Sequence, residues 1–262
     1  MNFLSGALNE FDATIDDVRS SIQFLDNAHF LRPRINGILR WEVVDGEVQQ
    51  NCREFMDAKS FRPEFIWAGL YIRLYGALEQ FIRRTIHDVV REIDNSIEKY
   101  DDLDDRIKRQ NICRTGDALA TFLQPPDHVS IDYASLCENI GSCTSGGKTF
   151  SLNADAFAMY YSNITAGQLE KVLTRIGIKL NWDDLCQCET LQTFFEQTGN
   201  VRRTADEVKK WLNKFTKDRN KIVHNGVGGI VVAKPDLETQ ANFLSVFTVA
   251  LADLVVAQSP VG

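Results

Sequence analysis

The amino-acid sequence predicts an all-α protein, built as a helical bundle with one long N-terminal helix. Apolar residues recur at intervals of three and four through most of the 262 residues, and this period is typical of helices that bury one face. Glycine, proline and N-capping residues stand at the ends of these periodic segments, where helices are expected to begin and stop. An apolar fraction of 44% with a charged fraction of 25% is ordinary for a globular domain.

The first periodic segment begins at Leu4. Its apolar residues alternate at intervals of four and three: Leu4, Leu8, Phe11, Ile15, Val18, Ile22 and Leu25. This spacing predicts a helix of about seven turns with a continuous apolar stripe. Because three heptads are marginal for an independent coiled coil, we expect the stripe to pack inside the protein rather than to form a dimer zipper.

The helical pattern is interrupted between residues 31 and 60. The segments Arg32-Pro33-Arg34 and Asn36-Gly37 are typical of turns. Residues 41–48, with Asp45-Gly46 in their second half, predict a small β-hairpin near residues 38–50. We therefore divide the chain into an N-terminal extension of helix and hairpin, residues 1–60, and a main helical domain, residues 61–257.

The main domain begins with a second long helix, which Pro63 opens as a first-turn residue and which runs to about Tyr100. A third helix is expected over residues 103–123, before Pro125-Pro126. Residues 125–200 are predicted to form an insert of shorter helices and loops. Within this insert, Thr165 is expected to cap a helix that Gly177 ends.

Two further helices complete the predicted domain. The first is expected to start with Thr204 as its N-cap and Glu207 as the capping-box partner. It should end at Asn225-Gly226, which is a stop signal for a helix. The second is an apolar helix that begins at about Pro235.

Other features of the sequence exclude several classes of protein. The stretch 243–257 is apolar but short, and it contains Asp253, so we expect a buried helix and no membrane partner. The N-terminus lacks the pattern of a secretory signal, which predicts a cytoplasmic protein with reduced cysteines. Cys186 and Cys188 have a spacing poorly suited to zinc and no histidine nearby, so we expect neither a metal nor a cofactor.

The glycine-rich segment 141–149 invites comparison with a phosphate-binding loop. That motif needs a glycine five residues before the glycine of Gly147-Lys148-Thr149, but Ser142 occupies this position. No strongly apolar strand precedes the segment either. A nucleotide-hydrolysing enzyme built on this loop is therefore disfavoured.

One segment is strongly basic, although the whole chain has a net charge of −7. The acidic balance argues against a surface that coats nucleic acid non-specifically, so any contact with nucleic acid must use a local patch. Residues 202–221 carry only three acids beside eight basic residues, which are Arg202, Arg203, Lys209, Lys210, Lys214, Lys217, Arg219 and Lys221. This patch leads directly to Arg219-Asn220-Lys221-Ile222-Val223-His224 at the expected helix stop.

Arg219 and His224 suit the cleavage of RNA without a metal. RNA carries its own nucleophile, the 2′-hydroxyl, so the reaction needs a group that transfers protons near neutral pH, which histidine provides. Arginine provides a fixed positive fork for the phosphate. The two side chains lie about 140° apart on an ideal helix, and we expect the chain to unwind at the helix end so that His224 can swing toward Arg219. The supporting, RNA-binding residues are expected to be Asn220, Lys221, Lys217 and Lys214.

These residues alone leave a structural role open. In that alternative, His224 only caps the helix and Arg219 pairs with Asp218 or another surface acid. The spacing does not decide between the two roles, because roughly one such arginine–histidine pair is expected by chance in a chain with four histidines.

The block Asp218–Gly226 resembles the signature of the HEPN superfamily, whose all-helical domains carry an R-x4–6-H motif, often with a polar residue directly after the arginine. Here Arg219 and His224 enclose four residues, and Asn220 takes the polar place. The segment 75–81, Tyr-Gly-Ala-Leu-Glu-Gln-Phe, resembles an earlier core helix of these domains. The segment 161–170 with Ile176-Gly177-Ile178 resembles the RiboL-PSP-HEPN and MAE_28990-like branches.

This resemblance implies a HEPN-like bundle and a metal-independent RNA endonuclease that acts as a toxin or phage-defence effector. It implies that Arg219 and His224 are the catalytic pair, with Asn220 as a polar helper, and that a homodimer brings two such pairs into one cleft. The expected partners are an RNA substrate and an antitoxin or other regulatory protein. Because some superfamily members are non-catalytic, the alternative is a helical interaction or nucleotide-sensing module.

Overall fold

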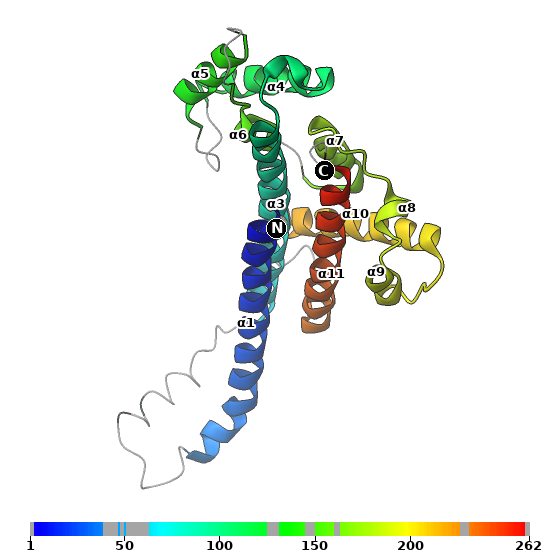
Figure 1. Cartoon of the computed structure of the whole chain (residues 1–262). Coiled ribbons are helices and arrows are strands. Elements are labelled where there is room, and N and C mark those ends of the chain that lie inside the picture. Colours follow the sequence, from blue (N-terminus) through cyan, green and yellow to red (C-terminus); the bar gives the residue numbers. More distant parts are fainter. Residues whose placement is uncertain are drawn as a thin grey trace.

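The computed structural model describes residues 3–38, 47, 50, 63–124, 131–144, 150–159, 163–225 and 231–259. Every regular element within these ranges is a helix (Figure 1), so the prediction of an all-α protein is confirmed. The hairpin expected near residues 38–50 lies outside the described residues except at Ile38, Glu47 and Gln50, and these three are helical.

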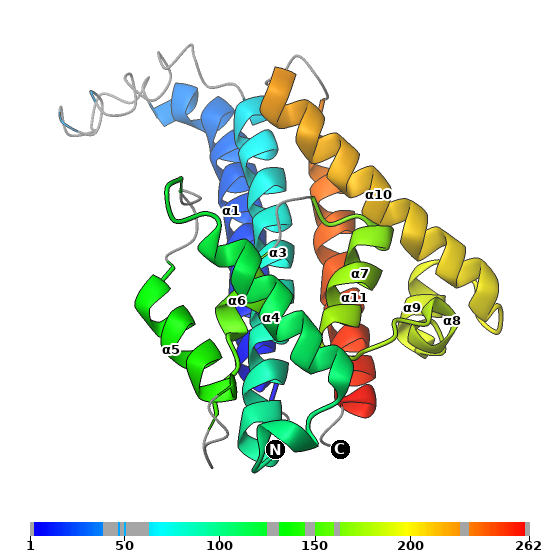
Figure 2. The same ribbon diagram turned by 90° about the horizontal axis from the view of Figure 1, so that it is seen from above.

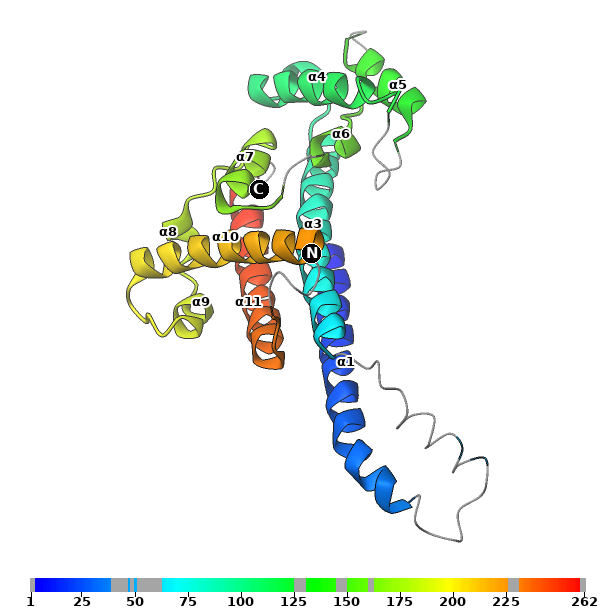
Figure 3. The same ribbon diagram turned by 180° about the vertical axis from the view of Figure 1, so that it is seen from behind.

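A central helix, α3, organises the bundle. The described elements are α1 (Ser5–Ile38), α3 (Pro63–Ser96), the 3-10 helix η1 (Tyr100–Asp102), α4 (Asp105–Leu119), α5 (Tyr133–Thr144), α6 (Ala154–Ala158), α7 (Ala166–Arg175), α8 (Trp182–Leu185), α9 (Glu189–Phe194), α10 (Val201–Asn225) and α11 (Lys234–Gln258). The helices α1, α6, α10 and α11 all pack against α3. Figures 1 and 3 show α1 lying alongside α3 in the opposite direction, while α10 crosses α3 and α11 at a steep angle.

The apolar stripe of α1 is buried, as the sequence predicts. Leu4, Phe11, Ile15 and Ile22 are each at most 3% exposed, so the stripe is an internal seam of the bundle. The helix is longer than expected, because it continues through the predicted turn residues to Ile38. A proline inside a helix removes one hydrogen bond and favours a kink, but adding residues to an existing helix is far easier than starting one.

Capping residues set the limits of the helices that matter for the site. Thr165 accepts a hydrogen bond from the Gln168 N–H (3.2 Å) at the start of α7, and Gly177 follows its end with φ of +83°. Both predictions for α7 are therefore confirmed. The predicted start of α10 is wrong by one turn. The side chain of Asn200 accepts a hydrogen bond from the Arg203 N–H (3.2 Å), whereas Thr204 lies buried inside the helix.

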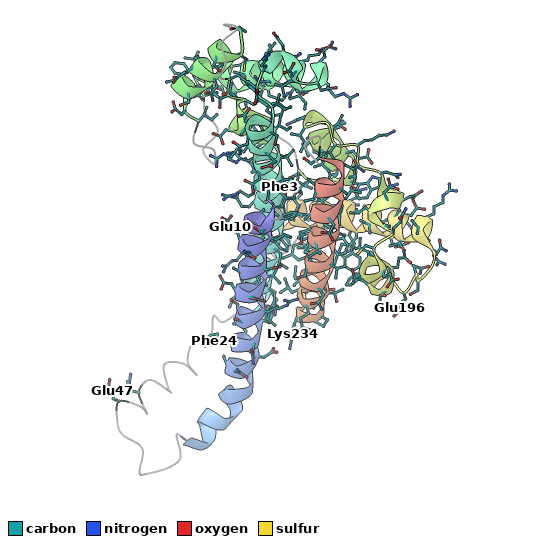
Figure 4. The ribbon with its side chains drawn as sticks, viewed as in Figure 1. Phe3, Glu10, Phe24, Glu47, Glu196 and Lys234 are labelled. Carbon is teal, nitrogen blue, oxygen red and sulfur yellow. The ribbon has the colours of Figure 1, made fainter. Side chains whose placement is uncertain are left out.

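The helix α11 supplies much of the core. By length and composition alone it could cross a membrane, and it is the one helix of this kind in the described ranges. Its apolar side chains, however, pack in the same core as those of α1 and α3. At its start lies Lys234 (Figure 4), which pairs with Asp26 of α1. The expectation of a buried helix after residue 234 is thus confirmed.

The helices between α3 and α10 form two groups. Figure 1 shows α4, α5 and α6 gathered at one end of α3, while Figure 2 shows α7, α8 and α9 beside α10 and α11. The side chains of Leu169, Val172 and Leu173 in α7 are buried in the main core. This packing fixes the start of α7 next to the C-terminal half of α10, where the predicted site lies.

Candidate functional site

The last turns of α10 carry the residues that the sequence predicts as functional. Phe215 and Ile222, at most 4% exposed, hold this part of the helix against the core. Because Ile222 anchors the last turn, the chain stays helical through Asn225, and the expectation that it unwinds at His224 is wrong. Arg219 and His224 therefore keep the wide angular separation of a regular helix and project toward different sides.

A groove of about 640 Å³ runs between α10 and the start of α7. The α10 side of the groove consists of Asn213, Thr216, Lys217, Asn220, Lys221, His224 and Asn225, and the α7 side of Asn163, Thr165 and Gln168. Residues 217, 220, 221 and 224 recur at intervals of three and four, so they share one face of α10. The structure thus brings together four of the predicted residues, His224, Asn220, Lys217 and Lys221.

Arg219 lies beside the groove rather than among the residues that line it. Its guanidinium stacks over the ring of Tyr75 from α3, with 5.1 Å from Cζ to the ring centroid. Its Nη1 donates a hydrogen bond to Asn220 Oδ1 (3.1 Å), which connects Arg219 to the groove. The Nε atom is buried and has no hydrogen-bond partner among the described residues. The guanidinium therefore keeps donor capacity that the described part of the chain does not use.

Tyr75 is itself held by the backbone that leads into α7. The Ile164 N–H donates to the Tyr75 hydroxyl (2.7 Å), and the Thr216 hydroxyl donates to the Ile164 carbonyl (2.5 Å). Burial is the largest cause of the raised pKa of Tyr75, so its hydroxyl stays neutral. These contacts join α3, α10 and the residues before α7, and they fix the ring on which Arg219 rests.

Lys214 is the predicted RNA-binding residue that the structure places elsewhere. Its Nζ lies 2.7 Å from Oδ2 of Asp218, and Lys221 Nζ lies 4.0 Å from the other carboxylate oxygen. Asp218 is only 4% exposed, and a buried carboxylate needs a charged or hydrogen-bonding partner. Lys214 therefore neutralises Asp218 outside the groove, and Arg219 has no ion pair with Asp218 in the described structure.

The α7 side of the groove is the part that reasoning from the sequence missed. Thr165 was identified as a helix cap, but nothing in the sequence indicated that Asn163 and Gln168 would face α10. Asn213 was missed as well; its Oδ1 accepts from the Ala166 N–H (3.0 Å) and ties α7 to α10. The available signal was the position of these residues around a capped helix start.

The described residues contain no group of three or more histidine, cysteine, aspartate or glutamate side chains placed to hold a metal ion. Cys186 lies fully buried, and burial raises its pKa to about 12. A thiol with this pKa stays protonated at neutral pH, so Cys186 is a core residue rather than a ready ligand. The neighbouring Cys188 contacts the Thr190 hydroxyl at 2.9 Å.

A second hollow lies near the C-terminal end of α3, around Asp94. Burial raises the pKa of Asp94 to about 6, although hydrogen bonds from the Leu152 N–H and the Ser151 hydroxyl lower it in part. The Leu152 N–H lies 3.0 Å from each carboxylate oxygen. His87, Arg91 and Asp155 also line this hollow. Asp94 thus fixes the chain before α6 to α3.

We expect Asp94→Asn to stabilise the protein at pH 7.5 by on the order of 1 kcal/mol, after allowance for partial exposure. The folded-state pKa of about 6 exceeds the ordinary value of 3.8, so the native protein binds the proton more tightly than the unfolded chain. The wild type therefore loses stability as the pH rises from about 4 to about 6, and the neutral amide does not. Urea unfolding at pH 4.5 and 7.5 measures this difference, and an equal difference at both pH values would contradict it.

A comparison with family models matches the RiboL-PSP-HEPN family over residues 47–257. No curated protein and no solved structure matches the chain. The matched range includes α3, α7 and α10. It therefore covers the whole groove and the tyrosine beneath Arg219.

Proposed function

The chain belongs to the RiboL-PSP-HEPN family, and we propose on this premise that it is a metal-independent RNA endonuclease of the toxin or phage-defence type. The observation that carries the proposal is the groove, in which His224 lies beside Asn220, Lys217 and Lys221. The groove combines a side chain that can transfer protons with two cations that can hold a phosphate. Such an enzyme needs an antitoxin or another regulatory partner to restrain it.

The proposed reaction uses the RNA 2′-hydroxyl as the nucleophile. Its oxygen attacks the adjacent phosphorus and loses its proton, the bond to the 5′-oxygen breaks, and this oxygen takes up a proton. The products are a 2′,3′-cyclic phosphate and a 5′-hydroxyl. His224 protonates the leaving oxygen, and Arg219 stabilises the charge that develops on the phosphate. The hydrogen bond from Arg219 to Asn220 places the guanidinium next to the groove.

The proposal includes a homodimer. Support comes from an apolar stripe on α3, where Phe65 is 54% and Ile72 is 36% exposed. Gly69 and Gly76 share this face at helical spacing, and Val223 of α10 is 48% exposed. Exposed apolar patches of this kind mark interaction surfaces. In the proposed dimer, a second copy supplies a second His224 to the same cleft, where it accepts the 2′-hydroxyl proton. Light scattering should then give twice the chain mass of 29.7 kDa.

One observation favours the alternative, a non-catalytic interaction or nucleotide-sensing module. Arg219 rests on Tyr75 and does not line the groove, so the groove of one chain holds only half of the pair. Such a module would bind nucleotides through Lys217, Lys221 and the groove amides without cleaving RNA.

Cleavage of RNA in the presence of a metal chelator separates the two functions. We expect the purified chain to cleave total RNA in excess chelator and to leave 2′,3′-cyclic phosphate ends. An oligoribonucleotide with a single 2′-deoxy sugar at the mapped cleavage position is the matched control, and it should resist cleavage because the nucleophile is missing. The absence of chelator-resistant cleavage, or equal cleavage of the 2′-deoxy control, would rule out the proposed reaction.

A further inference from the structure

The two sides of the groove differ in chemistry. Lys217, Lys221 and His224 line the α10 side, whereas Asn163, Thr165 and Gln168 on the α7 side are polar and neutral. A nucleotide has the same division, since its phosphate is anionic and its base is a neutral set of hydrogen-bond donors and acceptors. The cations suit the phosphate, which leaves the opposite side for the base.

Most N–H groups at the start of α7 are already paired, and only that of Gly167 has no acceptor among the described residues. A free helix N-terminus binds phosphate through unpaired N–H groups, but here the first turn is already capped. The Ala166 N–H donates to Asn213 Oδ1 (3.0 Å) and the Gln168 N–H to Thr165 Oγ1 (3.2 Å). The Leu169 N–H donates to the Thr165 carbonyl (2.9 Å). The donors that remain on this side of the groove are therefore mainly side-chain amides.

The amide groups of Asn163 and Gln168 have no hydrogen-bond partner among the described residues, and both side chains are half-buried. A side-chain amide offers two donor hydrogens and an acceptor oxygen, which is the combination that pairs with the edge of a nucleobase. Half-buried amides without a partner in the described part of the chain favour a ligand that supplies both donors and acceptors.

The backbone around these amides is fixed. Ile164 is fully buried, its N–H donates to the Tyr75 hydroxyl and its carbonyl accepts from the Thr216 hydroxyl. Asn163 and Thr165 flank this anchored residue, and the capped first turn carries Gln168. Binding groups on a rigid frame lose little entropy when a ligand arrives. A volume of about 640 Å³ is also typical of sites for small organic molecules.

We propose that the α7 side of the groove is a nucleobase subsite, in which the amides of Gln168 and Asn163 bind the edge of the base next to the phosphate held by Lys217, Lys221 and His224. This inference rests on the proposed function, because it takes RNA as the ligand. It adds that cleavage is selective for the base at this position, with Gln168 as the main specificity-determining residue.

The test measures the binding of the four nucleoside 3′-monophosphates, which carry base, 2′-hydroxyl and phosphate but cannot be cleaved. We expect the wild type to prefer one or two bases by roughly tenfold, the discrimination that a good base-edge contact provides. Gln168→Met keeps the length of the side chain and removes its hydrogen bonds, so it should abolish this preference. Gln23→Met, on the exposed face of α1, is the matched control and should retain it. Lys217→Met should weaken the binding of all four nucleotides by a similar factor.

The outcomes separate the subsite from the ribonuclease. Sequencing of the RNA ends should show a base preference in the wild type that Gln168→Met relaxes. Equal affinity of the wild type for all four nucleotides, with cleavage that resists a chelator, would overturn the subsite and leave the ribonuclease intact. The absence of any nucleotide binding together with the absence of cleavage would overturn both. An unchanged thermal midpoint in Gln168→Met would show that a lost preference does not come from misfolding.

Discussion

Replacing His224 with alanine should reduce chelator-resistant RNA cleavage by roughly a hundredfold to ten-thousandfold, the range that a general acid or base contributes. His224 is exposed in the last turn of α10 and lines the groove, and no described residue forms a hydrogen bond with it. Its removal therefore disturbs little of the fold, and the stability of His224→Ala should match that of the wild type. We therefore expect the substitution to slow the chemical step without changing the stability of the fold.

The matched control is His87→Ala. His87 lies on α3 in the hollow around Asp94 and is 21% exposed in its side chain. It contributes nothing to the groove, so this variant should cleave RNA at the rate of the wild type. The cleavage rates of both variants and the wild type are compared on one fluorescent oligoribonucleotide. An unfolding curve for each variant checks its stability. Cleavage by His224→Ala at the rate of the wild type would exclude His224 from catalysis.

The second large effect is expected for Arg219→Lys, which should lower kcat by roughly a hundredfold to a thousandfold. This is the typical cost of removing one group that stabilises transition-state charge. Lysine keeps the positive charge but loses the planar group that stacks on Tyr75 at 5.1 Å and reaches Asn220. RNA affinity should change much less than kcat, because the charge that attracts the backbone remains.

The matched control for this substitution is Arg203→Lys, since Arg203 is an exposed arginine of the same helix with the same charge. It should leave both kcat and KM near the values of the wild type. The split between the two constants separates a role in the reaction from a role in binding. A rise in KM with an unchanged kcat in Arg219→Lys would mean that Arg219 only attracts RNA, and the proposed catalytic pair would then be wrong.

Much of the fold follows from local patterns in the sequence. The stripe from Leu4 to Leu25 predicted a buried α1, and Thr165 with Gly177 marked α7 correctly. The errors arose where two local signals competed. Asn200 and Thr204 are both good N-caps, and burial of Thr204 against the core decided in favour of Asn200. The segment Arg32-Pro33-Arg34 is typical of a turn, although α1 extends beyond it.

By itself, the sequence determined the helical class, the basic segment 202–221 and the placement of Arg219 and His224 near the end of one helix. Tertiary structure alone decided which of these side chains meet. Buried Asp218 pairs with Lys214 and keeps it outside the groove, and Tyr75, from a distant helix, holds Arg219. The neutral side of the groove comes from α7, whose position depends on its buried leucines and on Ile164. Local spacing specifies a helix and its faces, but the face that meets a neighbour is set by packing between segments far apart in the chain.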